Sequence, residues 1–190
     1  MTDSATAKKE RLVQGARMVL YAQGVEKTTI ADVATAADVP LGNVYYYFKT
    51  KDDLVKAAID AHAQEIQAKL AGFEESNRTP KTRLKAFVRE WIEQADMAAQ
   101  YGCPHGSLCA ELDKGDGALG EEAAKLIELI VDWNERQFKE MGFNKREAHE
   151  NAMELVASFQ GAALLANTYG DPGIVVRQSK RSERWIDSLS

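Results

Sequence analysis

TTIADVATAADVPLGNVYYYF, residues 28–48, contains two short helical patterns separated by a tight turn. Thr29 and Asp32 have the spacing of a capping box, which predicts that a helix begins there. The apolar residues of this helix share one face, at Ile30, Val33, Ala34 and Ala37. Asp38 falls at the turn, where Asp tolerates the left-handed backbone, and Pro40 suits the first turn of the next helix. The stretch therefore predicts two short helices joined by a tight turn.

The second of these helices, expected over residues 41–48, has an unusual composition for a buried helix. Three consecutive tyrosines, Tyr45–Tyr47, point in three directions around a helix, so they cannot all be buried. Val44 and Phe48 are four residues apart and can face the interior together. The other side chains of this helix, including Asn43, are therefore left to contact a partner.

Those side chains have the chemistry of a DNA-binding surface. Tyr hydroxyls can bond phosphate oxygens, and an Asn amide can hydrogen-bond a base edge. Gly42 leaves room for a close approach of the backbone. The helix start at Thr28 and Thr29 presents N–H groups that favour a phosphate. The predicted DNA-binding residues are Thr28, Thr29, Leu41, Gly42, Asn43, Tyr45, Tyr46, Tyr47, Lys49 and Lys51.

Charge is distributed unevenly along the 190 residues, whose net charge is −5. Residues 1–51 carry seven Lys and Arg against five Asp and Glu, a balance of +2, and the remainder carries seventeen against twenty-four, a balance of −7. A basic front and an acidic remainder fit a protein that binds a polyanion with one end. With no long apolar run and no signal-peptide pattern, we expect a cytoplasmic protein without a membrane partner.

Apolar spacing is helical almost throughout the chain, which predicts an all-α fold of eight or nine helices. Residues 1–50 are expected to form a three-helix, helix-turn-helix DNA-binding domain. Residues 51–190 are expected to form a helical domain for ligand binding and dimerisation. The most marked polar break lies at residues 71–80, and another turn is expected at Gly115–Gly117. The expected helices are 6–23, 28–37, 41–48, 51–71, 81–100, 107–113, 119–141, 145–169 and 174–189.

The segment from Arg11 to Leu54 resembles the N-terminal domain of the TetR family of regulators. The resemblance rests on the apolar stripe that ends at Gly24 and on matching residues in the two short helices and beyond: Thr28, Thr29, Ile30, Asp32, Val33, Ala34, Ala37, Val39, Gly42, Tyr45, Phe48, Lys51 and Leu54. The family often has Gly at Asp38, Ser at Pro40, Lys or Arg at Leu41, and Thr or Ser at Asn43. These departures affect the base sequence that is recognised and some phosphate contacts, but not the fold.

The resemblance implies a homodimer that releases a palindromic operator duplex when a small molecule binds its C-terminal domain. Aromatic and apolar residues on three helices are candidates for the ligand pocket: Phe87, Trp91, Tyr101, Cys103, Leu126, Leu129, Trp133 and Phe159. The same residues can also form an ordinary core. Small residues at Gly161, Ala162 and Ala166 allow close helix packing, either within the subunit or across a two-fold dimer interface.

The segment Gly102–Glu111 resembles a Gly-Cys-x-x-Gly-x-Leu-x-x-Glu pattern in some members of the family, a few of which sense oxidants or electrophiles with the cysteine. Cys103 precedes a predicted helix, whose N-terminus lowers the pKa of a thiol. A buried structural cysteine is the alternative. Cys109 is expected to be the more buried of the two, and both are expected to be free thiols. The spacing of Cys103, His105 and Cys109 matches no common zinc pattern, so no metal is expected.

An enzyme and a helical interaction module are the two alternatives to a DNA-binding regulator. An enzyme would need a nucleophile beside a base, and Cys103 with His105 or Glu111 is the one candidate; no oxyanion site or cofactor loop accompanies it. We therefore expect no catalytic site and no cofactor. A helical interaction module without DNA would leave the exposed tyrosines beside lysines unexplained. The sequence does not distinguish a repressor from an activator.

Overall fold

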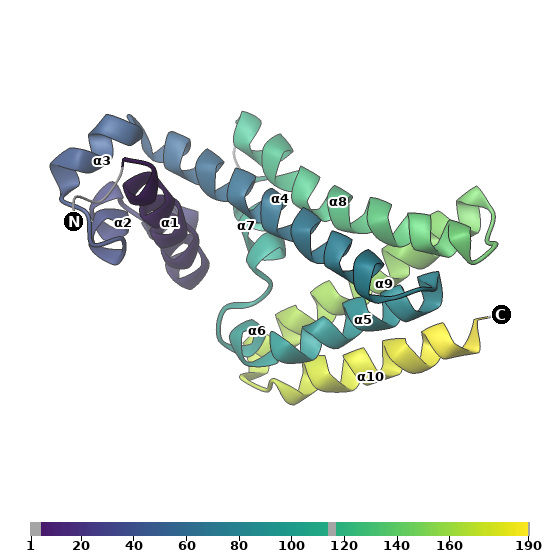
Figure 1. Cartoon of the computed structure of the whole chain (residues 1–190). Helices are drawn as coiled ribbons and strands as arrows, with labels where there is room; N and C mark the ends of the chain where they lie inside the picture. The colour runs from purple at the N-terminus through teal and green to yellow at the C-terminus, as the bar shows by residue number, and fades with distance from the viewer. Residues whose placement is uncertain (1–4, 114–116, 190) are drawn as a thin grey trace. The chain divides into compact units, whose positions relative to one another are not determined.

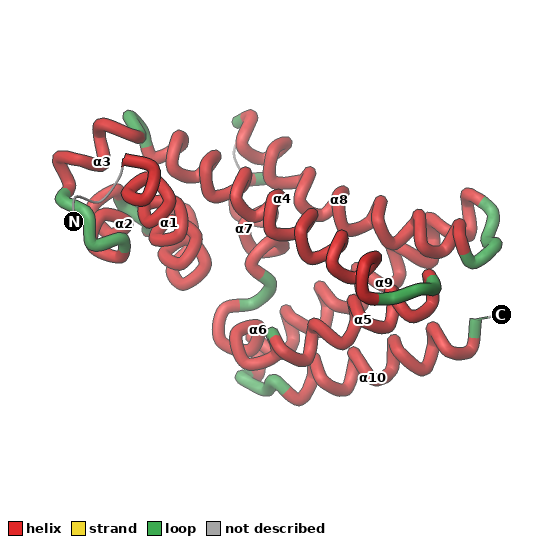
Figure 2. Tube along the Cα trace, viewed as in Figure 1, coloured by secondary structure: helices red, strands yellow, loops and turns green. Residues whose placement is uncertain are grey.

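The computed structural model describes residues 5–113 and 117–189, and every regular element in these residues is an α-helix (Figure 2). The all-α prediction is confirmed, with ten helices where eight or nine were expected. Part of the turn expected at Gly115–Gly117 lies outside the described residues. The helices are α1 Ala5–Lys27, α2 Ile30–Ala36, α3 Leu41–Tyr47, α4 Lys51–Ser76, α5 Pro80–Glu93, α6 Ala95–Tyr101, α7 Pro104–Leu112, α8 Ala118–Glu140, α9 Lys145–Tyr169 and α10 Gly173–Ser188 (Figure 1).

The helices divide between two compact units. The first unit consists of residues up to 64 together with 107–126, and the second consists of 65–106 together with 127 onward. Three helices, α4, α7 and α8, therefore begin in one unit and end in the other. Among the described residues, no helix is both long enough and apolar enough to cross a bilayer.

The first unit is built around α1, whose buried stripe contains Leu12, Ala16 and Leu20. Gly15 lies against α2, because a side-chain carbon at this position would come within 3.2 Å of Ala37 and of the Val33 carbonyl oxygen. The regular part of α1 stops at Gly24, as the sequence predicted, since Gly24 has φ 81° and ψ 169°. A short turn, 25–27, then leads into the two helices that follow.

The second unit packs α5, α6, α9 and α10 against one another (Figure 1). Ser179 and Ser182 on α10 are buried, and the Ser179 hydroxyl donates to the Val88 carbonyl of α5 at 2.6 Å. The single helix expected over 81–100 is wrong, because the chain breaks at Gln94 into α5 and α6. The buried residues Leu84, Val88, Trp91, Ala95 and Ala98 keep helical spacing across that break, so periodicity alone conceals it.

Candidate nucleic-acid interface and effector cavity

The two short helices α2 and α3 meet at the tight turn that the sequence predicts. Thr29 caps α2 in a complete capping box with Asp32. Asp38 has φ 51°, the only positive φ of a non-glycine residue in the part of the chain that the structure describes. The Val39 N–H donates to the Ala34 carbonyl at 3.0 Å and closes the turn. Residues 29–47 therefore form a helix-turn-helix unit.

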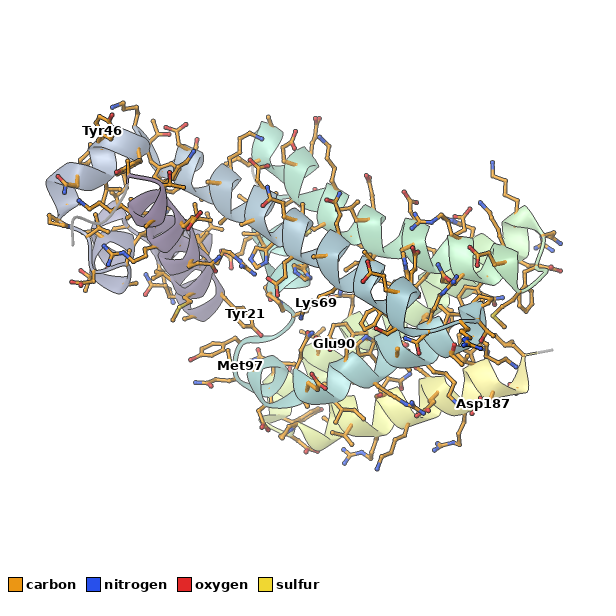
Figure 3. All side chains as sticks on the ribbon, in the orientation of Figure 1. Tyr21, Tyr46, Lys69, Glu90, Met97 and Asp187 are labelled. Atoms are coloured by element: carbon orange, nitrogen blue, oxygen red, sulfur yellow. The ribbon has the colours of Figure 1, made fainter. Side chains whose placement is uncertain are left out.

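Helix α3 divides its side chains between the interior and solvent. Val44 and Phe48 are buried, as expected. Tyr46 is 76% exposed and points away from the helix (Figure 3), while Leu41, Asn43 and Tyr45 are also exposed. The Tyr46 and Tyr47 rings make an edge contact, with centroids 5.0 Å apart. The outward face of α3 thus presents one amide and two well-exposed phenols.

Gly42 lies on the same outward face, and the fold does not require it. Apart from its chain neighbours and the backbone of its own helix, no atom of the described residues lies within 4 Å of the position that a side-chain carbon would occupy there. The glycine also has no positive φ that a larger residue would avoid. The fold would therefore accommodate a larger side chain at this position.

The two threonines before α2 have different roles, and the prediction for Thr28 is corrected. Thr28 is 4% exposed and its hydroxyl donates to the Gly24 carbonyl at 2.6 Å, so that hydroxyl is not presented to a phosphate. Thr29 is exposed, but its N–H and hydroxyl both donate to the Asp32 carboxylate, at 2.9 and 2.8 Å. The backbone and side-chain donors of Thr29 lower the pKa of Asp32, so a carboxylate already occupies this helix start.

Two lysines lie near the ends of α3 and α4. The Lys49 ammonium donates to the Tyr45 carbonyl, and the Lys51 ammonium donates to the Glu26 carbonyl at 3.1 Å. Both contacts are made to neutral oxygens, and the charge of Lys49 also helps to lower the pKa of Asp53. Asp53 lies at the start of α4 and accepts hydrogen bonds from the N–H groups of Lys49 and Thr50. These hydrogen bonds lower the pKa of Asp53, and the bond from the Thr50 N–H has the largest effect.

Glu111 contributes to the first unit in a way that the sequence analysis did not identify. Its carboxylate accepts the Val25 N–H at 2.6 Å, just after the break in α1. The same carboxylate packs against Gly24, since a side-chain carbon there would lie 2.6 Å from a Glu111 oxygen. Helix α7 therefore holds the turn that leads into α2. The sequence shows the Gly-Cys-x-x-Gly-x-Leu-x-x-Glu pattern that ends at Glu111. No local pattern predicts that Glu111 contacts Val25, which is 86 positions away.

The second unit contains a cavity of about 80 Å³. Four of the eight predicted pocket residues line it, namely Phe87, Trp91, Cys103 and Phe159. The other residues that line the cavity come mostly from α4, α5 and α9 and were not among the eight predicted pocket residues. They are Glu65, Ile66, Lys69, Leu70, Phe73, Glu90, Gln94, His105, Ile130, Val156 and Gln160.

The other four predicted pocket residues do not line this cavity. Trp133 is buried beside it, where its indole N–H donates to Glu74 at 2.8 Å and its ring lies 5.8 Å from that of Phe87. Leu126 is fully buried in the first unit, and Leu129 is half-buried. Tyr101 is half-buried, and its phenol oxygen accepts from the Gln100 amide at 2.7 Å.

The environment of Cys103 is that of the buried structural cysteine which the sequence left open, but the expected order of burial of the two cysteines is wrong. Cys103 is buried, whereas Cys109 is half-buried, and both are free thiols. Burial raises the pKa of Cys103 and outweighs the hydrogen bonds that its sulfur accepts from the Gly106 N–H and the Gln160 amide, each 3.4 Å long. The N–H groups at the start of α7 lower this pKa as predicted, but burial has the larger effect, so the expected net lowering is wrong.

This environment predicts slow alkylation of Cys103 in the native protein. The thiolate is the nucleophile, so a raised pKa reduces the reactive fraction at any given pH. We expect Cys109 to react faster at neutral pH, and the rate at Cys103 to keep rising above pH 9. A time course with iodoacetamide at several pH values, read by peptide mass spectrometry, measures both rates. Faster labelling at Cys103 would contradict the assignment.

Helix α9 has exposed apolar residues next to α10, whose side of the groove between the two helices is lined by Ile174, Arg177, Gln178 and Arg181. Leu164 is 65% exposed, Tyr169 is 72% exposed, and Leu165 lies with Gly161 along an open groove between the two helices. Of the predicted interface residues, Gly161 is exposed and Ala162 lines this groove. Ala166 is corrected: it is completely buried within the protomer, so its side chain is not available to a second subunit.

Comparisons with known proteins agree with this arrangement. Residues 12–58 match the model described as bacterial regulatory proteins, tetR family, and residues 80–180 match the C-terminal domain of LmrA/YxaF-like transcriptional regulators. An uncharacterised HTH-type transcriptional regulator of Lactococcus lactis is 27% identical over 88% of this chain and 87% of its own. The HTH-type transcriptional repressor DhaR of a Mycobacterium species is 24% identical over 84% and 82%. A TetR regulator structure from Legionella pneumophila has a TM-score of 0.82, with 24% identity and 98% of both chains covered.

Proposed function

Because this chain belongs to the TetR family of transcriptional regulators, we propose that it is a homodimeric repressor that a small molecule releases from a palindromic operator. Members of this family regulate transcription and are not enzymes. The observation that carries the proposal is the outward face of α3, where exposed Asn43, Tyr45 and Tyr46 surround a glycine that the fold does not need. The Mycobacterium relative DhaR is itself named a repressor, which supports repression over activation.

In this proposal α3 is the recognition helix and enters the major groove. Asn43 and Tyr46 face base edges, and Tyr45 and Lys51 contact phosphates. Gly42 allows the backbone of α3 to approach the DNA closely. Leu41, Tyr47 and Lys49 complete the DNA-facing surface, and Thr29 lies at its margin.

A second copy of the chain is proposed to cover the exposed face of α9 and α10. A group of exposed apolar residues such as those of α9, bordered by polar residues such as those of α10, is typical of a protein interface. Two copies of α9 and α10 related by a two-fold axis would form a four-helix interface. The dimer would then present two recognition helices to successive major grooves, about 34–36 Å apart or a multiple of that distance.

The cavity of the second unit is proposed as the effector site. An effector lowers DNA affinity only if it binds better to a protein conformation that does not fit the operator. Helices α4 and α7 each line the cavity in the second unit and continue into the first. Helix α7 begins beside the cavity residue His105 and ends beside Glu111, which holds Val25. Movement of α7 is therefore the proposed route to the DNA-binding helices.

Two variants of the DNA-facing surface test the proposed function. Lys51→Met should weaken binding to all duplexes alike and reduce the slope of log affinity against log salt by about one. Asn43→Ala should mainly reduce the preference for the operator over a scrambled duplex. Fluorescence anisotropy with the DNA upstream of the gene measures both effects. Lys145→Met removes a charge from the second unit and is the control; equal behaviour of the two lysine variants would count against the assignment.

Glu111 tests the route from the cavity to the DNA. In the Glu111→Ala protein the Val25 N–H loses its acceptor, so the turn before α2 is held less firmly. We expect weaker operator binding, by about threefold to thirtyfold for a lost charged hydrogen bond. We also expect the effector to lower the operator affinity of this variant by a smaller factor than it lowers that of the unmodified protein. Unchanged values of both quantities would show that α7 does not transmit the signal.

A further inference from the structure

The outward face of α3 offers a restricted set of side chains for reading bases. The seven residues of this helix, Leu41–Tyr47, include no Lys, Arg, Gln, Asp or Glu. Arg and Lys are the usual readers of guanine in the major groove, and Asp and Glu accept from the amino group of cytosine. Lys49 lies beyond the last turn of α3, where its ammonium donates to the Tyr45 carbonyl. The strongest readers of a G·C pair are therefore missing from this face.

The side chains that are present on this face fit the two bases of an A·T pair. Asn43 is exposed, and among the described residues its amide makes no hydrogen bond. An Asn amide matches adenine, because it donates to N7 and accepts from the N6 amino group at the same time. Thymine is distinguished in the major groove by its methyl group, which apolar side chains contact. The Tyr46 ring, which is 76% exposed, supplies such an apolar surface.

Asn43 and Tyr46 lie close enough together to contact neighbouring base pairs. They are three residues apart on the helix, so their Cβ atoms are about 5–6 Å from each other on one face. Tyr46 points away from the helix (Figure 3), and its ring is restricted by the edge contact with Tyr47. Gly42, one turn earlier on the same face, has no side chain that could cover the Tyr46 ring.

We propose that α3 recognises A·T pairs, with the Asn43 amide on an adenine and the Tyr46 ring against the methyl group of a neighbouring thymine. This inference rests on the proposed function, in which α3 enters the major groove. The Tyr46 hydroxyl both donates and accepts, so it discriminates little among base edges, and the ring determines the specificity. The base pairs under the centre of α3 in each half-site are then A·T.

Base analogues test this inference on the operator, which is identified by selection from a random duplex library. Uracil in place of thymine removes only the methyl group, and 7-deazaadenine in place of adenine replaces the N7 acceptor with a C–H group. Each analogue is placed at one position of a half-site at a time, and affinity is measured by anisotropy at constant salt. At one position uracil should weaken binding by about threefold to fourfold. At a neighbouring position 7-deazaadenine should weaken it by about fivefold.

Variants of the two residues assign each effect to its side chain. Asn43→Ala should lose the response to 7-deazaadenine and keep the response to uracil. Tyr46→Ala should lose the response to uracil and keep the response to 7-deazaadenine, so each variant is the matched control of the other. Tyr46→Phe should still respond to uracil, because it keeps the ring. Melting temperatures establish that the three variants remain folded, and the analogue measurements on the unmodified protein depend on no variant.

Three results would overturn the inference and leave the proposed function in place. They are a two-fold symmetric operator whose base pairs under α3 are G·C, an unmodified protein that responds to neither analogue, and a Tyr46→Phe protein that no longer responds to uracil. The last result would assign the specificity to the hydroxyl. A library from which no preferred sequence emerges would instead contradict the proposed function, and this inference with it.

Discussion

A Gly42→Glu protein is expected to lose operator binding while its thermal stability is unchanged or higher. Among the described residues, no other part of the fold occupies the space beside Gly42, so a side chain there disturbs none of their contacts. Replacing glycine inside a helix also stabilises it, by about 0.5–1 kcal/mol in the case of alanine. If α3 lies in the major groove, the new carboxylate meets phosphates and base edges. Like-charge contacts cost several kcal/mol, so we expect a loss of operator affinity of roughly a hundredfold or more.

Two further variants make this result specific. Gly42→Ala tests size without charge and should weaken operator binding less than the glutamate does. Gly72→Glu is the matched control, because Gly72 also lies in a helix with open space around its missing side chain. Operator affinity by anisotropy and melting temperature by circular dichroism are measured on all three. Full operator affinity in the Gly42→Glu protein would exclude α3 as the recognition helix.

The Leu164→Glu, Leu165→Glu double variant is expected to be monomeric and to bind the operator weakly. These side chains are 65% and 48% exposed in the protomer, so glutamate is tolerated there until a second copy covers them. In the dimer the carboxylates would be buried without partners. Linking two binding modules raises affinity by about 100- to 10,000-fold, and that gain disappears with the dimer.

Sedimentation velocity and operator titration measure the two consequences together. Ile92→Glu places one glutamate at an exposed apolar position on α5 and is the control for the substitution type, with one carboxylate against the two of the double variant. The account expects Ile92→Glu to remain dimeric with full operator affinity. A double variant that stays dimeric would show that another face joins the subunits.

The sequence was sufficient for the parts of the fold that local chemistry determines. The capping box of Thr29 and Asp32, the left-handed Asp38 and the stop at Gly24 were all predicted and are confirmed, because each depends on residues within a few positions. Long-range packing was not predictable in this way. Cys103 stands between Gly102 and Pro104, which is typical of an exposed break, yet Gln160 from α9 contacts its sulfur.

The small residues of α9 show a second limit of sequence patterns. Periodicity identifies Ala162, Ala163 and Ala166 as a face that allows close packing, but it does not say which helix packs there. In the structure these residues are buried and α9 packs against α6 of the same protomer, where the Asn167 amide donates to the Ala99 carbonyl at 3.2 Å. The neighbouring face, with Leu164 and Leu165, is the one left exposed. Two adjacent faces of one helix therefore differ: one packs inside the protomer and the other is exposed.

The central claim is that a dimer of this protein recognises two-fold symmetric DNA through α3. The most direct measurement is selection of binding sites from a random duplex library, followed by hydroxyl-radical footprinting of the selected sequences. The account predicts an inverted repeat whose half-sites are protected about one helical turn apart, or a whole number of turns apart. It also predicts that the Gly42→Glu protein protects neither half-site. A single protected patch without symmetry, or a library from which no preferred sequence emerges, would contradict it.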